Sequence, residues 1–371
     1  MDPSNDLLRR VNPVMVTLAR ESRGLNQTQL ATELGITQGR LSKIESGVLT
    51  IPEDLLNRIS HMLGYPKHFF QRSGERVGVG VAELFHRKQQ GVSTRVLARI
   101  HAIIEIRSVL HFPALLRSVE ISSSIPELDI EEYDCNAGRI ADLVRATLEL
   151  PRGPIHQLVN VIEDAGGIVV PFDFETRQID AISRWVPGLP PLFFLNSAIP
   201  TDRARWSLAH ELGHMVMHKL PSPEIEHQAN EFAAEFLVPE RDVRSDLSDL
   251  TLPKLANLKR YWKVSMQALL KRAEALGTVT PNRARYLWSQ IGNAGYRRRE
   301  PVELDLPAER PELVHELFEV HRRDLGYSIA DLCEMLAVRE DDLFTWYCQA
   351  DAGSPLRLVN AVNQVVGPGT A

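Results

Sequence analysis

Two histidines and a glutamate are spaced so that they could form part of a metal centre. The segment His210-Glu211-Leu212-Gly213-His214 places two imidazoles four residues apart. On a helix such residues share one face, so both rings can reach one ion, and Glu211 beside them can accept a proton from water. The apolar residues around the motif predict a mostly buried helix over about 201–218. Because buried polar side chains are costly without partners, the motif favours a bound metal.

A catalytic zinc site needs a third protein ligand and keeps one position open. Residues 226–237 are predicted to form the next helix, with Glu226 at its start and Asn230 one turn further along the same face. We expect Glu226 to be a carboxylate ligand and Asn230 to be an amide that hydrogen-bonds a ligand imidazole. This spacing resembles that of thermolysin-like gluzincins. Glu231 and Glu235 are alternative ligands.

The elements around this motif predict a small sheet that carries the metal helix. Short apolar runs over 167–172, 180–184 and 191–195 are typical of strands, so we expect three or four of them. Further helices are predicted up to residue 291, and a last helical block over 307–349.

The first 75 residues form a second pattern, in which short helices are separated by glycines. Helices are predicted over 14–21, 26–34, 37–45 and 52–63, and the segment from Gly24 to Gly47 has the spacing helix, glycine turn, helix. Polar side chains at the start of the third helix suit base edges and phosphates. The candidate DNA-contacting residues are Gln27, Thr37, Gln38, Gly39, Arg40, Ser42 and Lys43.

Composition restricts the class of protein. The chain has 371 residues, and 42 Lys/Arg against 48 Asp/Glu give a formal net charge of −6, so any DNA contact must come from a local patch. Residues 72–118 carry eight Lys/Arg against three acids. We interpret them as a helical face packed on a neighbour; an extension of a DNA footprint is the alternative. Three scattered cysteines argue against a disulfide framework, and no apolar run reaches the length of a membrane span. With no signal-peptide pattern, a cytoplasmic protein is expected.

Both segments resemble known families. Residues 203–214 together with the following ExxANxFAAEFLVP stretch look like the ImmA/IrrE family of zinc metallopeptidases, over about residues 150–245. Residues 14–68 resemble the Cro/repressor (XRE) helix-turn-helix. The first resemblance implies His210, His214 and Glu226 as zinc ligands, Glu211 as general base, and a protein substrate such as a transcriptional repressor. The second implies that the position of Gln27 meets a phosphate and that of Gln38 meets bases.

The sequence therefore predicts a mostly helical α+β protein with an all-α helix-turn-helix domain (1–75), a helical linker (76–150), a zincin-like domain with a small β-sheet (151–291) and an all-α C-terminal region (292–371). The leading hypothesis is a DNA-binding transcriptional regulator with a zinc-dependent metallo-endopeptidase domain. Its expected partners are double-stranded operator DNA, a repressor-like protein substrate and a second copy in a homodimer, with no membrane. The alternative is a DNA-binding regulator or antitoxin-like repressor whose zincin domain is a non-proteolytic sensor or dimerisation module.

Overall fold

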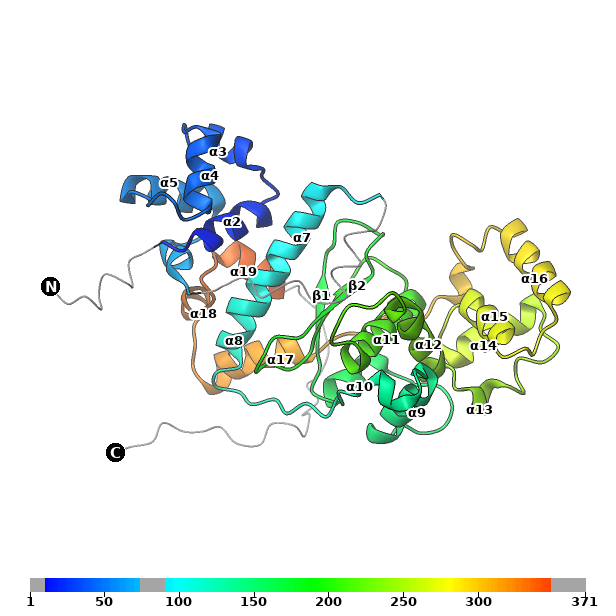
Figure 1. Ribbon diagram of the computed structural model, residues 1–371. Coiled ribbons are helices and arrows are strands. Elements are labelled where there is room, and N and C mark those ends of the chain that lie inside the picture. Colours follow the sequence, from blue (N-terminus) through cyan, green and yellow to red (C-terminus); the bar gives the residue numbers. More distant parts are fainter. Residues whose placement is uncertain (1–10, 74–90, 348–371) are drawn as a thin grey trace, which may run out of the picture.

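The computed structural model describes residues 11–73 and 91–347. It confirms the predicted class, because a three-stranded sheet lies in the middle of a mostly helical structure (Figure 1). The N-terminal helices lie at one end of the molecule, the sheet lies in the middle, and α14–α16 lie at the other end. Within the described residues, no helix has the length and apolarity needed to cross a membrane.

The N-terminal region is a bundle of short helices with its own core. Its elements are α2 (Pro13–Ser22), α3 (Gln27–Glu33), α4 (Gln38–Glu45), α5 (Glu53–Leu63) and a 3₁₀ helix (Lys67–Gln71). Side-chain hydrogen bonds cap the N-termini of α3 and α4. Asn26 and Gln29 form a capping box at α3, and the Thr37 side chain accepts a hydrogen bond from the Arg40 N–H at α4. Between them Gly35 takes a left-handed conformation (φ 62°), which glycine adopts without strain. The predicted helix–glycine turn–helix spacing is therefore present.

The sheet has the order β1-β3-β2, with β1 (Ile168–Phe172) parallel to β3 (Leu192–Asn196) and β2 (Ala181–Arg184) antiparallel to it. Each strand lies within about one residue of its predicted run. Both faces are buried, since Val169 and Phe193 pack into one core and Val170 and Phe194 into another. Continuous apolar strands are typical of a sheet covered on both sides.

Helices α9–α12 cover the first face of the sheet, and the chain then extends into a helical lobe. These helices are α9 (Ala137–Thr147), α10 (Leu158–Asp164), α11 (Thr201–Met217) and α12 (Ile225–Leu237). The lobe contains α13 (Glu240–Val243), α14 (Leu252–Trp262), α15 (Met266–Ala275) and α16 (Pro281–Asn293).

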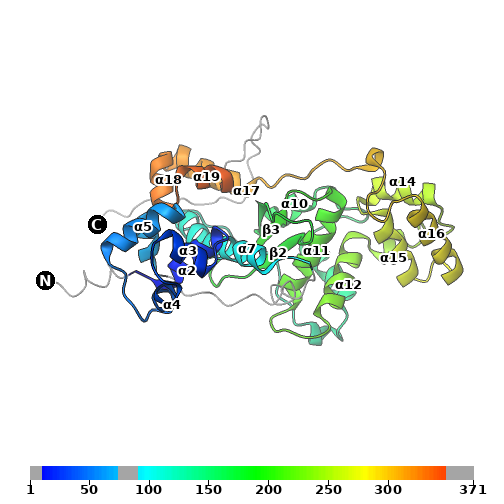
Figure 2. The ribbon, with the colours of Figure 1, turned by 90° about the horizontal axis from the view of Figure 1, so that it is seen from above.

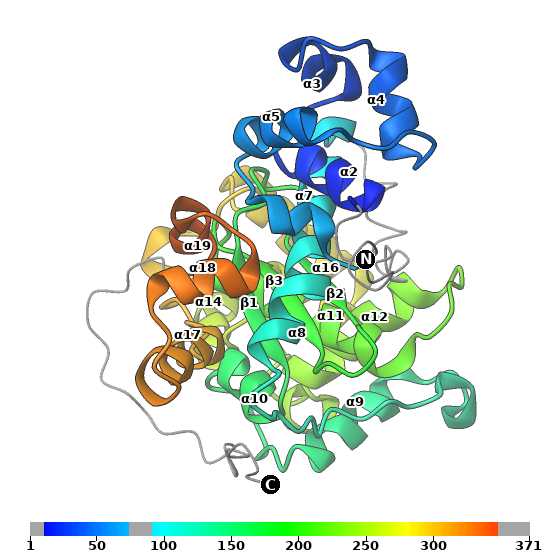
Figure 3. The same cartoon turned by 90° about the vertical axis from the view of Figure 1, so that its left-hand side faces the viewer.

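The second face of the sheet is covered by α7 and by the C-terminal helices. α7 (Thr94–Ile106) continues through a π-helical turn (Arg107–His111) into α8 (Phe112–Leu115). After α16 the chain crosses back along the molecule in extended form before α17 (Leu313–Glu319), so the predicted helical block starts six residues later than expected (Figure 2). A π-turn (Val320–Asp324), α18 (Ile329–Leu336) and α19 (Glu340–Tyr347) complete it. These helices lie beneath the N-terminal bundle (Figure 3).

Candidate metal centre and DNA-binding interface

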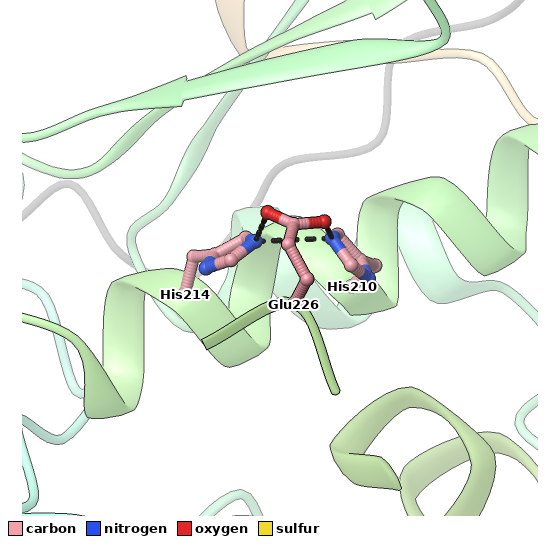
Figure 4. A group of neighbouring side chains, drawn as sticks. All are labelled: His210, His214 and Glu226. Atoms are coloured by element: carbon pink, nitrogen blue, oxygen red, sulfur yellow. Dashed lines mark hydrogen bonds and ion pairs between the residues drawn. The ribbon is translucent and has the colours of Figure 1, made fainter. Parts of the chain in front are cut away.

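Three of the predicted site residues converge. His210 and His214 project from α11, and Glu226 reaches them from the first turn of α12 (Figure 4). The two Nε2 atoms are 3.0 Å apart, and the Glu226 carboxylate oxygens lie 3.6 Å from His210 Nε2 and 3.4 Å from His214 Nε2. Ligand atoms around a tetrahedral zinc ion are about 3.3 Å apart, because each bond to nitrogen or oxygen is about 2.0–2.1 Å long. The donor set fits Zn²⁺ in both chemistry and spacing.

The three side chains form a site that is closed on one side and open on the other. The His214 side chain is only 4% exposed, whereas that of Glu226 is 46% exposed. The imidazole rings of His210 and His214, which face the carboxyl group of Glu226, hold its pKa well below its ordinary value. Glu226 is therefore a carboxylate at neutral pH, as a metal ligand must be.

A third histidine orients the buried ligand. His218 lies one turn beyond His214, with the two Nδ1 atoms 3.0 Å apart, and its Nε2 is 3.0 Å from Gln228 Oε1. Burial, followed by the charge of His214, lowers the pKa of His218 to about 4, so this ring is neutral at pH 7. A neutral ring that donates from Nε2 to the Gln228 oxygen can only accept at Nδ1. His214 must then donate from Nδ1, which leaves its Nε2 lone pair directed at the site.

The glutamate between the two histidines is held by the outer strand of the sheet. Glu211 is buried, and its Oε2 accepts hydrogen bonds from the Ser183 backbone N–H at 2.9 Å and from the Ser183 hydroxyl at 2.5 Å. Because β2 is an outer strand, this N–H points away from β3 and towards α11. The carboxylate is thus fixed beside the histidine pair.

Gly213 allows the two metal-site helices to approach closely. A Cβ atom at this position would lie 3.0 Å from Cδ1 of Phe232 on α12, tighter than ordinary packing allows. The glycine inside the motif therefore permits the contact that brings Glu226 to the histidines.

At the other end of the molecule, the predicted DNA-contacting residues gather around the start of α4. Gln38, Gly39, Arg40 and Lys43 are exposed, together with the N-cap residue Thr37, while Ser42 is half-buried. Gln27 is also half-buried and accepts at Oε1 from Gln38 Nε2 at 2.7 Å.

A buried ion pair supports this surface from below. Gln27 Nε2 donates to Glu45 at 2.8 Å, and Glu45 pairs with the buried Arg20 at 2.6 Å. The chain of contacts runs from the core to Gln38, so the N-terminus of α4 is held in one orientation before any ligand binds. Such an arrangement suits a helix whose first residues read base edges.

Comparison with known families gives one match for each of these two regions of the chain. Residues 17–70 match the helix-turn-helix family model, and residues 162–274 match the model of a peptidase family described as the IrrE N-terminal-like domain. The chain joins a helix-turn-helix domain to an IrrE N-terminal-like domain. The predicted resemblance to both families is therefore confirmed. No curated protein sequence gives a significant match to the chain.

The remaining predicted residues of the metal site, Asn230, Glu231 and Glu235, all lie on α12. Asn230 is exposed, and its Nδ2 donates to the Glu226 backbone carbonyl at 2.6 Å instead of to an imidazole. Of the alternative ligands, Glu231 pairs with His227 at 3.2 Å, and Glu235 pairs with Arg272 and accepts from the Glu240 N–H. Glu226 is the acid that the structure brings to the histidine pair.

A large cleft runs along the same domain. Its volume is about 1630 Å³, and it is lined by Trp206 and Ser207, one turn before His210 on α11, and by Asn230 on α12. The opposite wall is formed by α15, with Gln267 and Lys271, and by the loop that follows α16. The candidate metal ligands do not line this cleft, so it flanks the histidine helix and does not contain the metal centre.

Two contacts of the site were not predicted from the sequence. His218 could have been found from spacing alone, because it repeats the four-residue interval of His210 and His214. Ser183 offers no such signal: it lies on a strand 28 residues away from Glu211, and only the packing of β2 against α11 brings it there.

Proposed function

We propose that this protein is a DNA-binding transcriptional regulator whose IrrE N-terminal-like domain is a zinc-dependent metallo-endopeptidase that cleaves a partner protein such as a repressor. The observation that carries the proposal is the convergence of His210, His214 and Glu226, with Glu211 fixed beside them. A site with three protein ligands leaves room for a fourth, as catalytic zinc sites do.

The roles of the side chains follow from their positions. Zinc, when bound, supplies a Lewis acid that polarises a peptide carbonyl and makes water more acidic. Glu211 takes a proton from the attacking water and returns it to the leaving amine, and Ser183 keeps the carboxylate in place for both transfers. His218 and Gln228 hold His214 in the tautomer that binds through Nε2.

The helix-turn-helix domain supplies the DNA contacts. Thr37, Gln38, Gly39, Arg40, Ser42 and Lys43 belong to the segment that we propose enters the major groove, with Gln27 at a phosphate. Residues 17–70 carry little net positive charge, so their attraction to DNA phosphates is small and one copy binds weakly. A homodimer on two half-sites of an operator compensates for this.

Proteolysis is tested by following new N-termini. Total protein from cells lacking this gene is incubated with the purified full-length chain, with and without a chelator, and neo-N-termini are identified by mass spectrometry. We expect cleavage of at least one repressor-like protein, loss of cleavage with chelator, and recovery on addition of Zn²⁺. Glu211→Gln keeps the size of the side chain and removes the base, so it is the matched inactive variant.

The outcomes separate an enzyme from a sensor. Cleavage that persists in Glu211→Gln would come from a contaminating protease. A chain that holds one zinc ion but produces no new N-termini would overturn the peptidase proposal and leave a metal-binding module without proteolytic activity. A chain without zinc, whose metal content His210→Ala does not change, would overturn the ligand set as well.

A further inference from the structure

A second cavity lies on the opposite side of the sheet from the metal centre. Its volume is about 770 Å³, and it is enclosed by α7, by the end of β1 and by the C-terminal helices α17–α19. Most of its inner wall is apolar and buried, with Ile100, Ile103, Phe172, Val314, Phe318 and Leu332 among the lining residues. A volume of this size and lining is typical of small-molecule sites.

One of the arginines that line this cavity is buried in its apolar wall. Arg107, which lines it, is 2% exposed, and its guanidinium carbon lies 4.5 Å from the ring centre of Tyr347 and 5.6 Å from that of Phe194. Its Nη2 donates to the Trp346 carbonyl at 3.2 Å, while its Nε has no hydrogen-bond partner among the residues that the structure describes. A guanidinium carries five N–H donors, so donors such as the Nε–H remain for a ligand after the contacts with Trp346 and Tyr347.

The other buried arginines of the protein show what Arg107 lacks. Arg184 pairs with Glu105 at 2.5 Å, and Arg205 pairs with Glu309. Arg145 donates to three backbone carbonyls. Within residues 11–73 and 91–347, Arg107 has no carboxylate partner; its partners are the Trp346 carbonyl and the Tyr347 side chain. A buried charge without a counter-ion is destabilising, so an anion that entered the cavity would give the guanidinium a charged partner where the local dielectric constant is low.

The surroundings of Arg107 define the ligand by its chemistry. Five acids and four further arginines line the cavity, all of them half-buried or exposed, so the buried guanidinium is the charge that lies among the apolar side chains of the inner wall. One cation balances one negative charge, which favours a carboxylate over a dianionic phosphate. We propose that this cavity binds a small monocarboxylate with an apolar body, whose carboxylate pairs with Arg107 and whose body lies against α17 and α18.

The backbone at Arg107 adds an independent indication. Arg107–His111 form a π-helical turn at the point where α7 continues into α8, and such turns occur frequently at functional sites. The two sides of α7, which leads into this turn, lie in different cores: Ile103 faces the cavity, whereas Ala102 and Ile106 pack into the core of the helix-turn-helix domain. The proposed site is therefore one helix away from the DNA-binding domain.

The proposal is tested by calorimetric titration of the full-length protein with acetate, butanoate, octanoate and benzoate. Octanamide, which has the shape of octanoate without its charge, and octyl phosphate are the comparison ligands. We expect saturable binding of octanoate or benzoate, and binding of octanamide that is at least about tenfold weaker, because a charge-assisted pair is lost. Equal binding of octanoate and octanamide would overturn the carboxylate assignment, and absence of binding by all four acids would overturn the site.

Two variants locate the binding. Arg107→Gln should weaken octanoate binding by about tenfold or more and leave octanamide binding nearly unchanged. Val314→Trp keeps the arginine and fills the cavity, so it should abolish binding of both ligands even if the first variant folds poorly. Arg145→Gln changes an equally buried arginine outside the cavity and is the matched control. Octanoate binding that survives both Arg107→Gln and Val314→Trp would place the ligand elsewhere. None of these measurements depends on peptidase activity.

Discussion

Arg23, the C-cap residue of α2, and Asp342 of α19 form a bidentate ion pair across 319 residues of sequence, with N–O distances of 2.8 Å and 2.5 Å. The same guanidinium donates to the Leu63 carbonyl at 2.7 Å and lies 4.6 Å from the ring centre of Tyr65. Nearby, Arg72 donates to the Met335 carbonyl at 3.0 Å. Directional hydrogen bonds from the planar guanidinium groups of Arg23 and Arg72 thus hold the helix-turn-helix domain against the C-terminal helices.

Breaking this pair should loosen the DNA-binding domain from the rest of the protein. In Arg23→Ala and Asp342→Ala we expect faster hydrogen exchange in α19 and in the 3₁₀ helix that precedes residue 72, measured by mass spectrometry. Because the pair is bidentate and partly buried, the double-mutant cycle should give a coupling of about 1 kcal/mol. The pair Lys67–Glu53, with side chains 47% and 81% exposed, is the control and should show a smaller coupling. Additive effects of Arg23→Ala and Asp342→Ala would contradict the prediction.

Ser183 should affect turnover more than metal content. Ser183→Ala removes the hydroxyl that donates to Glu211 and keeps the backbone donor, so one hydrogen bond to a charged group is lost. If the domain is a peptidase, kcat should fall about tenfold while zinc per chain stays constant. Ser183→Thr should retain most activity, and Ser248→Ala, which removes a hydroxyl that donates to the Ser245 carbonyl outside the cleft, is the control. A parallel loss of zinc would mean that Ser183 supports the fold of the site instead.

Sequence periodicity predicts what lies on one helix. His210, Glu211 and His214 fall on α11 because the interval of four residues is a property of the helix itself, and the apolar residues between them fix the buried face. The strands could be predicted for a similar reason, since runs such as 168–172 and 192–195 are apolar throughout. The same holds for the caps at Asn26 and Thr37, where side-chain chemistry is local.

Contacts between distant segments could not be predicted in this way. Ser183 reaches Glu211 only because β2 is the outer strand beside α11. The extended segment between α16 and α17 is stabilised by Glu309, which pairs with the buried Arg205 and accepts a hydrogen bond from the Val159 N–H at 2.9 Å. No pattern in residues 305–312 predicts these partners. Arg107 lies within the basic stretch 72–118, which by itself does not predict a buried side chain. Its burial results from the packing of the sheet and of α19 around it.

His218 should control how tightly the metal is held. His218→Phe removes the acceptor for the His214 Nδ1–H, so the tautomer and the ring orientation of that ligand are no longer fixed. We expect zinc affinity, measured by competition with a chromophoric chelator, to fall about 10- to 100-fold. His227→Phe changes an exposed histidine on α12 and should leave the affinity unchanged. An equal affinity of His218→Phe and the wild type would exclude this positioning role.

Substitutions in α4 should distinguish residues that contact DNA phosphates from residues that contact bases. Duplexes that bind the full chain are first selected from a random library, and affinity is then measured at several salt concentrations. Lys43 is exposed near the end of α4, so Lys43→Ala should weaken binding to all sequences alike and reduce the salt slope by about one.

Gln38 lies at the first turn of the same helix, and Gln38→Ala should relax the preference at one base pair by about 1–3 kcal/mol with little change in slope. Lys67→Ala, which changes an exposed cation away from α4, is the control for loss of charge alone. If Lys43→Ala and Lys67→Ala alter the slope equally, α4 is not the element that faces DNA. A base preference that survives Gln38→Ala and Arg40→Ala together would mean that other residues read the sequence.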